Sequence, residues 1–280
     1  MQRFFHELEN FDPDELLLLI GSCAVCLVGF FRWLLKLRPV SKLGCHPLHR
    51  APLYLALLAG FAVIAWVVWR FAAEEVRGNS GYVLLVFAMG GACLTLAAAL
   101  FPWLGIGLRN DAFEGRNFAA VLALSGAILG VMFTYAAANA GEGPSFWNNV
   151  FSSSLATGAL LLLWLMVALA GGAASSVVEE RDTASGLRLG GLLLAEGLIL
   201  ARAIAGDWHS AAGTTKDFVR DAWPALALVM AAIVVERSLR PTSSNPRPSW
   251  TTHGLAPALI YLFGAAAWLA RMGWWEGAMR

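Results

Sequence analysis

Hydrophobic and polar residues follow one another in long blocks along this chain. Apolar runs of about 20 residues, the length at which a helix crosses a bilayer, recur near residues 15–37, 53–73, 82–106, 117–139, 147–171, 186–206, 219–237 and 255–274. The runs are too long for barrel strands and lack an alternation of period two. We therefore predict an all-α integral membrane protein with about eight transmembrane helices.

Two of these runs depart from an uninterrupted apolar pattern. The run at 186–206 contains Glu196 and Arg202, and the run at 219–237 contains Pro224. Charged residues inside a membrane helix are costly, so they are expected to face the interior of the bundle. In these two runs the pattern predicts helices that contact other helices through polar or irregular positions, in addition to lipid.

An internal repeat links two of the runs. A shift of about 71 residues lays Asn117–Phe133 over Arg188–Ile204. Four positions are then identical: Leu122, Gly126, Ile128 and Leu129 match Leu193, Gly197, Ile199 and Leu200. Both stretches open the second helix of a hairpin on the same side of the membrane. We predict four parallel hairpins whose central pair is a tandem repeat, divided into residues 1–80, 82–208 and 216–280.

The first copy also carries a family resemblance. Its text is Asn117–Ala120, then Leu122–Ala123, Ser125–Gly126 and Leu129–Gly130, with Gly190–Gly191 and Gly197 in the second copy. On these residues, about 82–208 resembles the YjfL-like family of small bacterial inner-membrane proteins, which have four spans in two hairpins. The chain differs by having Arg188 where the second copy usually repeats the Asn, and by two flanking hairpins. The resemblance implies a context of stress response, polyamine-related proteins or membrane maintenance, without a chemistry.

Composition and charge agree with a membrane protein. The chain is 58% hydrophobic and 14% charged, whereas soluble domains carry roughly 25% charged residues. The net charge of +1 gives no electrostatic reason to expect nucleic acid as a partner. We expect the lipid bilayer itself as the main surroundings.

Basic residues are distributed unevenly between the two sides of the predicted bundle. One side holds twelve of the 20 basic residues. They are Arg32, Lys36, Arg38, Lys42, Arg50, Arg109, Arg116, Arg181, Arg188, Arg237, Arg240 and Arg247. The positive-inside rule makes this side cytoplasmic. It predicts a multi-pass bacterial inner-membrane protein with both termini in the periplasm.

Glu196, Arg202 and Ser125 form a candidate intramembrane polar site. Glu196 lies in the middle of a predicted span, and Ser125 occupies the matching position of the first copy at the shift of 71 residues. Glu196 could hold a proton or a cation, or it could be a neutral hydrogen-bonded group that joins helices. Arg202 could extend toward the outer interface.

A second candidate lies in the turn between the third and fourth spans. Arg109, Asp111, Glu114, Arg116 and Asn117 stand close together there. They could form a polar site or a docking surface for a cytoplasmic protein partner. The alternative is a solvated turn with a salt bridge and a helix cap.

The sequence offers no catalytic set, cofactor or metal site. The cluster Cys45-His46-Pro47-Leu48-His49 matches no common zinc spacing, and no nucleotide-binding or hydrolase motif is present. We predict a non-enzymatic, homo-oligomeric membrane component. The alternatives are a secondary transporter or ion pathway that uses Glu196, and a membrane enzyme acting at the Arg109–Asn117 turn.

Overall fold

The computed structural model describes residues 11–37, 50–244 and 248–273, and it is helical throughout these ranges apart from turns and an isolated bridge. The helices follow the predicted runs closely. They are α2 (Pro13–Leu37), α3 (Ala51–Phe71), α4 (Glu74–Gly78), α5 (Ser80–Leu100), α6 (Phe118–Ala137), α7 (Phe146–Met166), α8 (Ala173–Val178), α9 (Thr183–Ile204), α10 (Ala211–Leu239) and α11 (Ala256–Met272). The fold class predicted from the sequence is confirmed as all-helical.

Seven of the described helical segments are long and apolar enough to cross a membrane. The predicted count was about eight, and the difference is α9, the helix at 186–206. Helix α9 is long enough but carries Arg188, Glu196 and Arg202, so it does not count among the apolar segments. It is enclosed by the other helices, because most of its side chains are buried.

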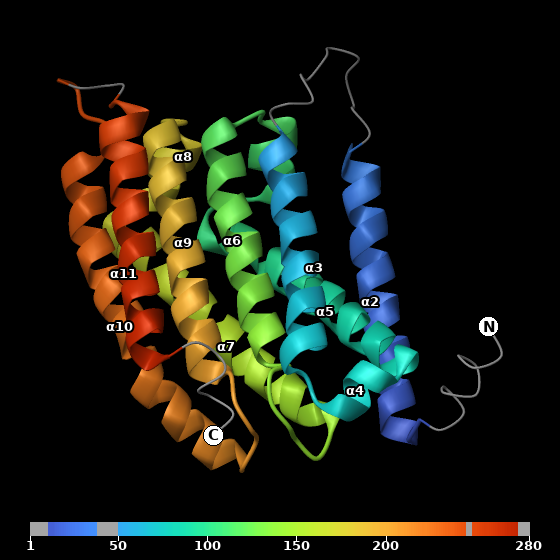
Figure 1. The fold of residues 1–280 in the computed structure, drawn as a ribbon. Helices are drawn as coiled ribbons and strands as arrows, with labels where there is room; N and C mark the ends of the chain where they lie inside the picture. The colour runs from blue at the N-terminus through green and yellow to red at the C-terminus, as the bar shows by residue number, and fades with distance from the viewer. Residues whose placement is uncertain (1–10, 38–49, 245–247, 274–280) are drawn as a thin grey trace.

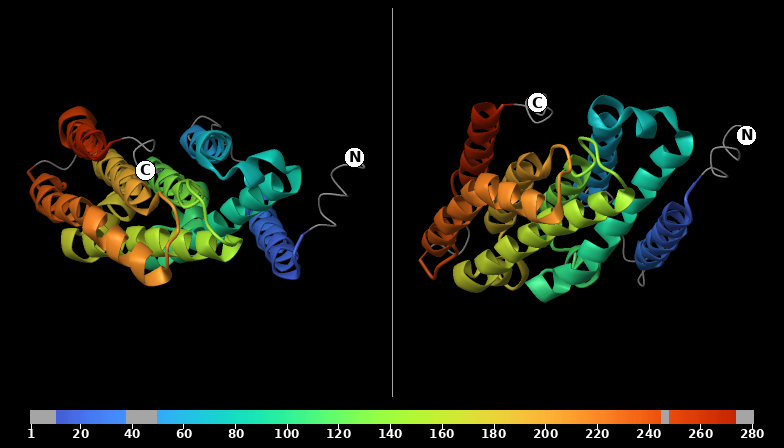
Figure 2. Two further views of the ribbon diagram at one scale, coloured as in Figure 1. Left: turned by 60° about the horizontal axis from the view of Figure 1, so that its bottom comes forward. Right: turned by 90° about the horizontal axis from the view of Figure 1, so that it is seen from below.

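The long helices form two layers (Figures 1 and 2). Helices α3, α6, α9 and α11 stand side by side in one layer, and α2, α5, α7 and α10 lie behind them. Helix α2 begins and α11 ends at the same end of the bundle, the lower end in Figure 1. The other end carries the turns that precede α6 and α9, which we call the turn end.

Helices α6 and α9 form the centre of the bundle and run parallel. A Cβ atom added to Gly126 would overlap the backbone of Gly190, and one added to Gly197 would overlap the backbone of Gly130. Small residues at these spacings let two membrane helices approach until their backbones touch. Gly126 meets Gly190, and Gly130, one turn later on α6, meets Gly197, which is also later on α9. The two helices therefore run in the same direction.

The turns that precede α6 and α9 are built alike. Each has a left-handed glycine, then a non-glycine residue with positive φ, then a side chain that caps the helix. The matching residues are Gly105 and Gly172, Arg116 and Arg181, and Asn117 and Asp182. The two caps are 65 residues apart in the sequence, whereas the sequence comparison used about 71. Matched by their caps, Ser125 pairs with Gly190 and Glu196 pairs with Val131.

Candidate functional site

Glu196 lies in the middle of α9 and is completely enclosed. Its exposed fraction is 0%, and neither carboxyl oxygen has a hydrogen-bond partner among the described residues. An isolated buried carboxylate would be strongly destabilising. We therefore expect Glu196 to carry a proton and to be neutral in this arrangement.

Tyr261 of α11 carries a second buried polar group, its hydroxyl, that lacks a hydrogen-bond partner among the described residues. Its side chain interacts electrostatically with Glu196. It is also within electrostatic range of Arg188 and Glu236, which form a buried ion pair nearer the turn end.

That ion pair joins α9 to α10. The guanidinium group of Arg188 donates to both carboxylate oxygens of Glu236, each at 2.8 Å, and the two side chains are 0% and 3% exposed. Such a two-bond arrangement is the strong geometry for Arg and a carboxylate. Because both charges are removed from solvent, each depends on the other.

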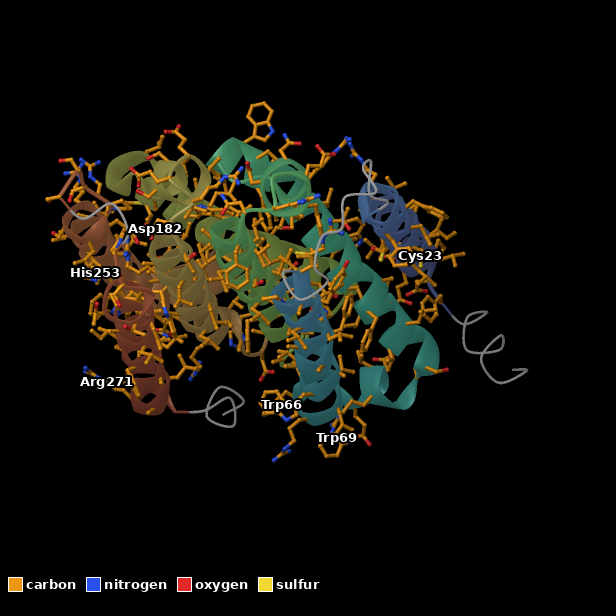
Figure 3. All side chains as sticks on the ribbon, turned by 90° about the horizontal axis from the view of Figure 1, so that it is seen from above. Cys23, Trp66, Trp69, Asp182, His253 and Arg271 are labelled. Carbon is orange, nitrogen blue, oxygen red and sulfur yellow. The ribbon has the colours of Figure 1, made fainter. Side chains whose placement is uncertain are left out.

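Two further partners complete the coordination of Arg188. Its guanidinium group donates to the hydroxyl oxygen of Ser185 at 2.8 Å and to the backbone oxygen of His253, in the turn before α11. Ser185 in turn donates to Asp182, the cap of α9, at 2.7 Å. Figure 3 looks onto the turn end and shows Asp182 and His253 on the same side of the bundle. The network therefore fastens α9 to α10 and to the start of α11.

Arg188 is consequently not a loop residue. It is one of the twelve basic residues assigned above to the cytoplasmic side, although it lies within the predicted run 186–206. Removing Arg188 from that group leaves eleven. The basic excess that sets the proposed orientation is reduced but keeps its sign.

Arg202 lies at the opposite end of α9 from Arg188. Its guanidinium group donates to the backbone oxygens of Gly273 at 2.9 Å and Met272 at 3.1 Å, so it covers the end of α11. It also lines a polar cavity of about 340 Å³ together with Asp207, Asp221 and other residues. Arg202 is 7% exposed and lies in the last turn of α9, and its extension toward the outer interface stays a prediction.

The three residues of the predicted intramembrane site are not brought together. Ser125 donates its hydroxyl hydrogen to the backbone oxygen of Val121 at 2.7 Å, within its own helix. Its neighbour Gly126 meets Gly190, six residues before Glu196, which corresponds to about 9 Å along a helix. Arg202 lies another six residues beyond Glu196. These are three separate positions at different depths.

The second candidate, the turn before α6, is held by local interactions. Arg109 and Glu114 form an exposed ion pair at 2.6 Å. A carboxylate oxygen of Asp111 accepts from the backbone of Gly107 at 2.6 Å. Arg116 is the residue with positive φ, at 52°. These contacts are those of a salt-bridged turn, which was the alternative to a polar or docking site.

The side chain of Asn117 makes hydrogen bonds to two different segments. Its side-chain oxygen accepts from the backbone of Ala119 at 3.0 Å and of Ala120 at 3.3 Å, which caps α6. Its amide nitrogen donates to the backbone oxygen of Val177 at 2.6 Å. Because Val177 belongs to α8, just before α9, Asn117 links the two similar turns.

Side chains that could ligate a metal ion are dispersed over the described part of the chain. Among the described residues, no three His, Cys, Asp or Glu side chains lie close enough to hold a metal ion. The cluster Cys45–His49 lies outside the described residues. The prediction of a protein without metal or cofactor stays a prediction.

The pair Arg188–Glu236 and the hydroxyl group of Tyr261 were missed by sequence reasoning. A signal was present, since Arg188 stands inside a predicted span and Glu236 directly follows the apolar run Ala222–Val235. Two opposite charges at span ends on one membrane side are candidates for a pair. Their pairing required knowing that α9 and α10 are neighbours.

Comparisons with family models, with curated proteins and with solved structures find no match for this chain. The site therefore has to be interpreted from its own geometry.

Proposed function

We propose that this chain is a non-enzymatic, multi-pass component of a bacterial inner membrane, with both termini in the periplasm. The observation that carries the proposal is the buried Arg188–Glu236 pair, whose charges bind each other and the neighbouring segments. Arg202 likewise binds backbone oxygens, and the Arg109–Asn117 turn is held by local contacts. Arg188 and Arg202 thus hold helices together, whereas Glu196 makes no such bond among the described residues.

A link to stress response or membrane maintenance belongs to this proposal and rests on the YjfL-like resemblance of residues 82–208. The similar turns before α6 and α9 support the related proposal that the two central hairpins are a tandem repeat. Their caps favour a register of 65 residues, which pairs Asn117 with Asp182. At this register Arg116 and Arg181 also coincide, and both have positive φ.

A homo-oligomer is also part of the proposal. The small-residue faces that suggested it are used inside one chain, between Gly126 and Gly190 and between Gly130 and Gly197. An oligomer would therefore use another surface. The mass of the purified protein in detergent, measured by light scattering, distinguishes one copy from several, and a monomer at all concentrations would remove this part of the proposal.

An ion or proton pathway through Glu196 is the second candidate. The specific observation in its favour is that Glu196 and Tyr261 are both buried with polar atoms that lack partners among the described residues, and that they interact electrostatically. Carboxyl and hydroxyl groups buried in membrane helices are among the side-chain groups that transfer protons. The polar cavity that holds Arg202 does not include Glu196 in its lining, which favours the first proposal.

Proton flux separates the two candidates. The full chain is reconstituted in liposomes that contain a pH-sensitive dye, and an imposed pH gradient is followed over time. We expect the wild-type chain and Glu196→Gln to dissipate the gradient no faster than empty liposomes. A flux that is present in the wild type and absent in Glu196→Gln would overturn the first proposal and establish the second.

A further inference from the structure

A groove runs along the surface between α2, α5 and the turn that follows α5. Its volume is about 710 Å³, within the range of roughly 300–1,000 Å³ typical of ligand sites. The walls are mainly small or apolar side chains, including Ala24, Val28, Ala98 and Ala99. Contact between Gly29 and Thr95 fixes how closely the two helices approach.

The groove opens toward the bilayer. Both α2 and α5 belong to the segments that are apolar enough to cross a membrane, and 11% of the α2 segment is buried. Val28 is 57% exposed and Leu96 is 60% exposed, and both line the groove. At this depth the surrounding medium is hydrocarbon, so a lipid chain is the occupant that fits the walls.

One end of the groove is polar. Arg32, Arg109 and Asn110 line it there, at the turn end of the bundle. Arg109 is engaged by Glu114, while Arg32 and Asn110 make no side-chain hydrogen bond among the described residues. A cation and an amide beside an apolar channel can bind a phosphate while the channel holds a chain.

We propose that this groove binds one anionic phospholipid, with an acyl chain along α2 and α5 and the phosphate at Arg32 and Asn110. Basic pockets between membrane helices on the cytoplasmic side bind anionic headgroups in this way. The basic excess of the turn end places the site on that side. The inference is independent of whether Glu196 conducts protons.

The test uses two variants of the full chain and two matched controls. Arg32→Gln removes the headgroup contact, and Ala99→Trp fills the channel from an exposed position on α5. The controls are Arg77→Gln, an exposed arginine on α4, and Ala65→Trp, an exposed alanine on α3. Each protein is placed in nanodiscs that contain equal amounts of phosphatidylglycerol and phosphatidylcholine, and the lipids retained after gentle detergent release are identified by native mass spectrometry.

We expect the wild-type chain and both controls to retain phosphatidylglycerol in preference to phosphatidylcholine. Arg32→Gln should lower that preference about five-fold, as expected for one basic residue near the membrane surface. Ala99→Trp should lower the retention of both lipids. Unchanged retention in both variants, or an equal loss in the controls, would overturn the site. Loss of phosphatidylcholine and phosphatidylglycerol in equal proportion on Arg32→Gln would overturn the anionic selectivity.

Discussion

Helices α6 and α9 lie side by side at the centre of the bundle and differ in what they carry. Both begin at a capped turn of the same construction, and both use glycines for the contact between them. Helix α6 has no charged residue, whereas α9 has Arg188, Glu196 and Arg202. The two helices therefore share the same kind of glycine contact although only α9 carries charged residues. In this fold, close helix packing does not depend on the charges that a helix carries.

The difference also determines what each helix binds. Helix α6 contacts its neighbours mainly through apolar and small side chains, together with two uncharged hydrogen bonds. Tyr135 donates to the backbone oxygen of Val86 at 2.6 Å, and the hydroxyl groups of Thr134 and Thr157 bond to each other at 3.1 Å. Helix α9 adds ion-pair and backbone contacts to α10 and to the segments that begin and end α11. The charges of α9 therefore hold the C-terminal hairpin to the centre. The tests below compare the two helices, beginning with the largest expected effect.

Breaking the buried pair of α9 should be the most destabilising change. Glu236→Leu leaves the guanidinium group of Arg188 buried without its carboxylate, which costs about 3–5 kcal/mol. The double variant Arg188→Met with Glu236→Leu removes both charges and should be considerably more stable than Glu236→Leu alone. The measurement is the free energy of unfolding in mixed micelles with increasing denaturing detergent.

The control for this pair comes from the turn before α6. Glu114→Gln breaks the exposed pair with Arg109 and should cost less than about 1 kcal/mol. If Glu236→Leu costs no more than Glu114→Gln, the buried pair does not hold the helices together as described.

Closing the gap between α6 and α9 should have the next largest effect. Gly126→Ala places a Cβ atom against the backbone of Gly190, and overpacking of this kind costs about 1–3 kcal/mol. Gly158→Ala on α7 has no heavy atom within 4 Å of the added Cβ and should leave the stability unchanged or slightly higher. Thermal unfolding followed by circular dichroism measures both. Equal melting temperatures for the two variants would contradict the close contact.

Removing either cap should have a smaller effect of similar size in the two helices. Asn117→Ala and Asp182→Ala each remove a side chain that accepts from two backbone N–H groups, and such losses cost about 0.5–2 kcal/mol. The two effects should be similar because each variant also breaks one further bond, from Asn117 to the backbone oxygen of Val177 or from the hydroxyl group of Ser185 to Asp182. Hydrogen exchange of the first turns of α6 and α9 provides the measurement. Loss of protection in one helix without any in the other would show that the two turns are not equivalent.

The helix positions could be predicted from the sequence because apolar run length alone defines a membrane helix. Close helix packing at Gly126 and Gly130 could also be predicted, since small residues at that spacing indicate it. The partners of Arg188 could not be predicted from the sequence. Glu236 is far away in the sequence, and the two meet only because α9 and α10 pack together. The register of the proposed repeat could not be predicted for a related reason, because Leu and Gly recur at many shifts, whereas the helix caps favour a shift of 65 residues.

Glu196 offers the most direct test of how α9 differs from α6, because α6 has a valine at the matching position. The measurement is infrared difference spectroscopy of the wild type against Glu196→Gln at neutral pH, with Glu114→Gln as an exposed control. We predict that the wild type shows the carbonyl absorption of a protonated carboxyl group, and that Glu196→Gln lacks it while Glu114→Gln keeps it. Loss of ionised carboxylate absorption in Glu196→Gln, with no change in the protonated-carboxyl region, would contradict a neutral Glu196 enclosed in the bundle.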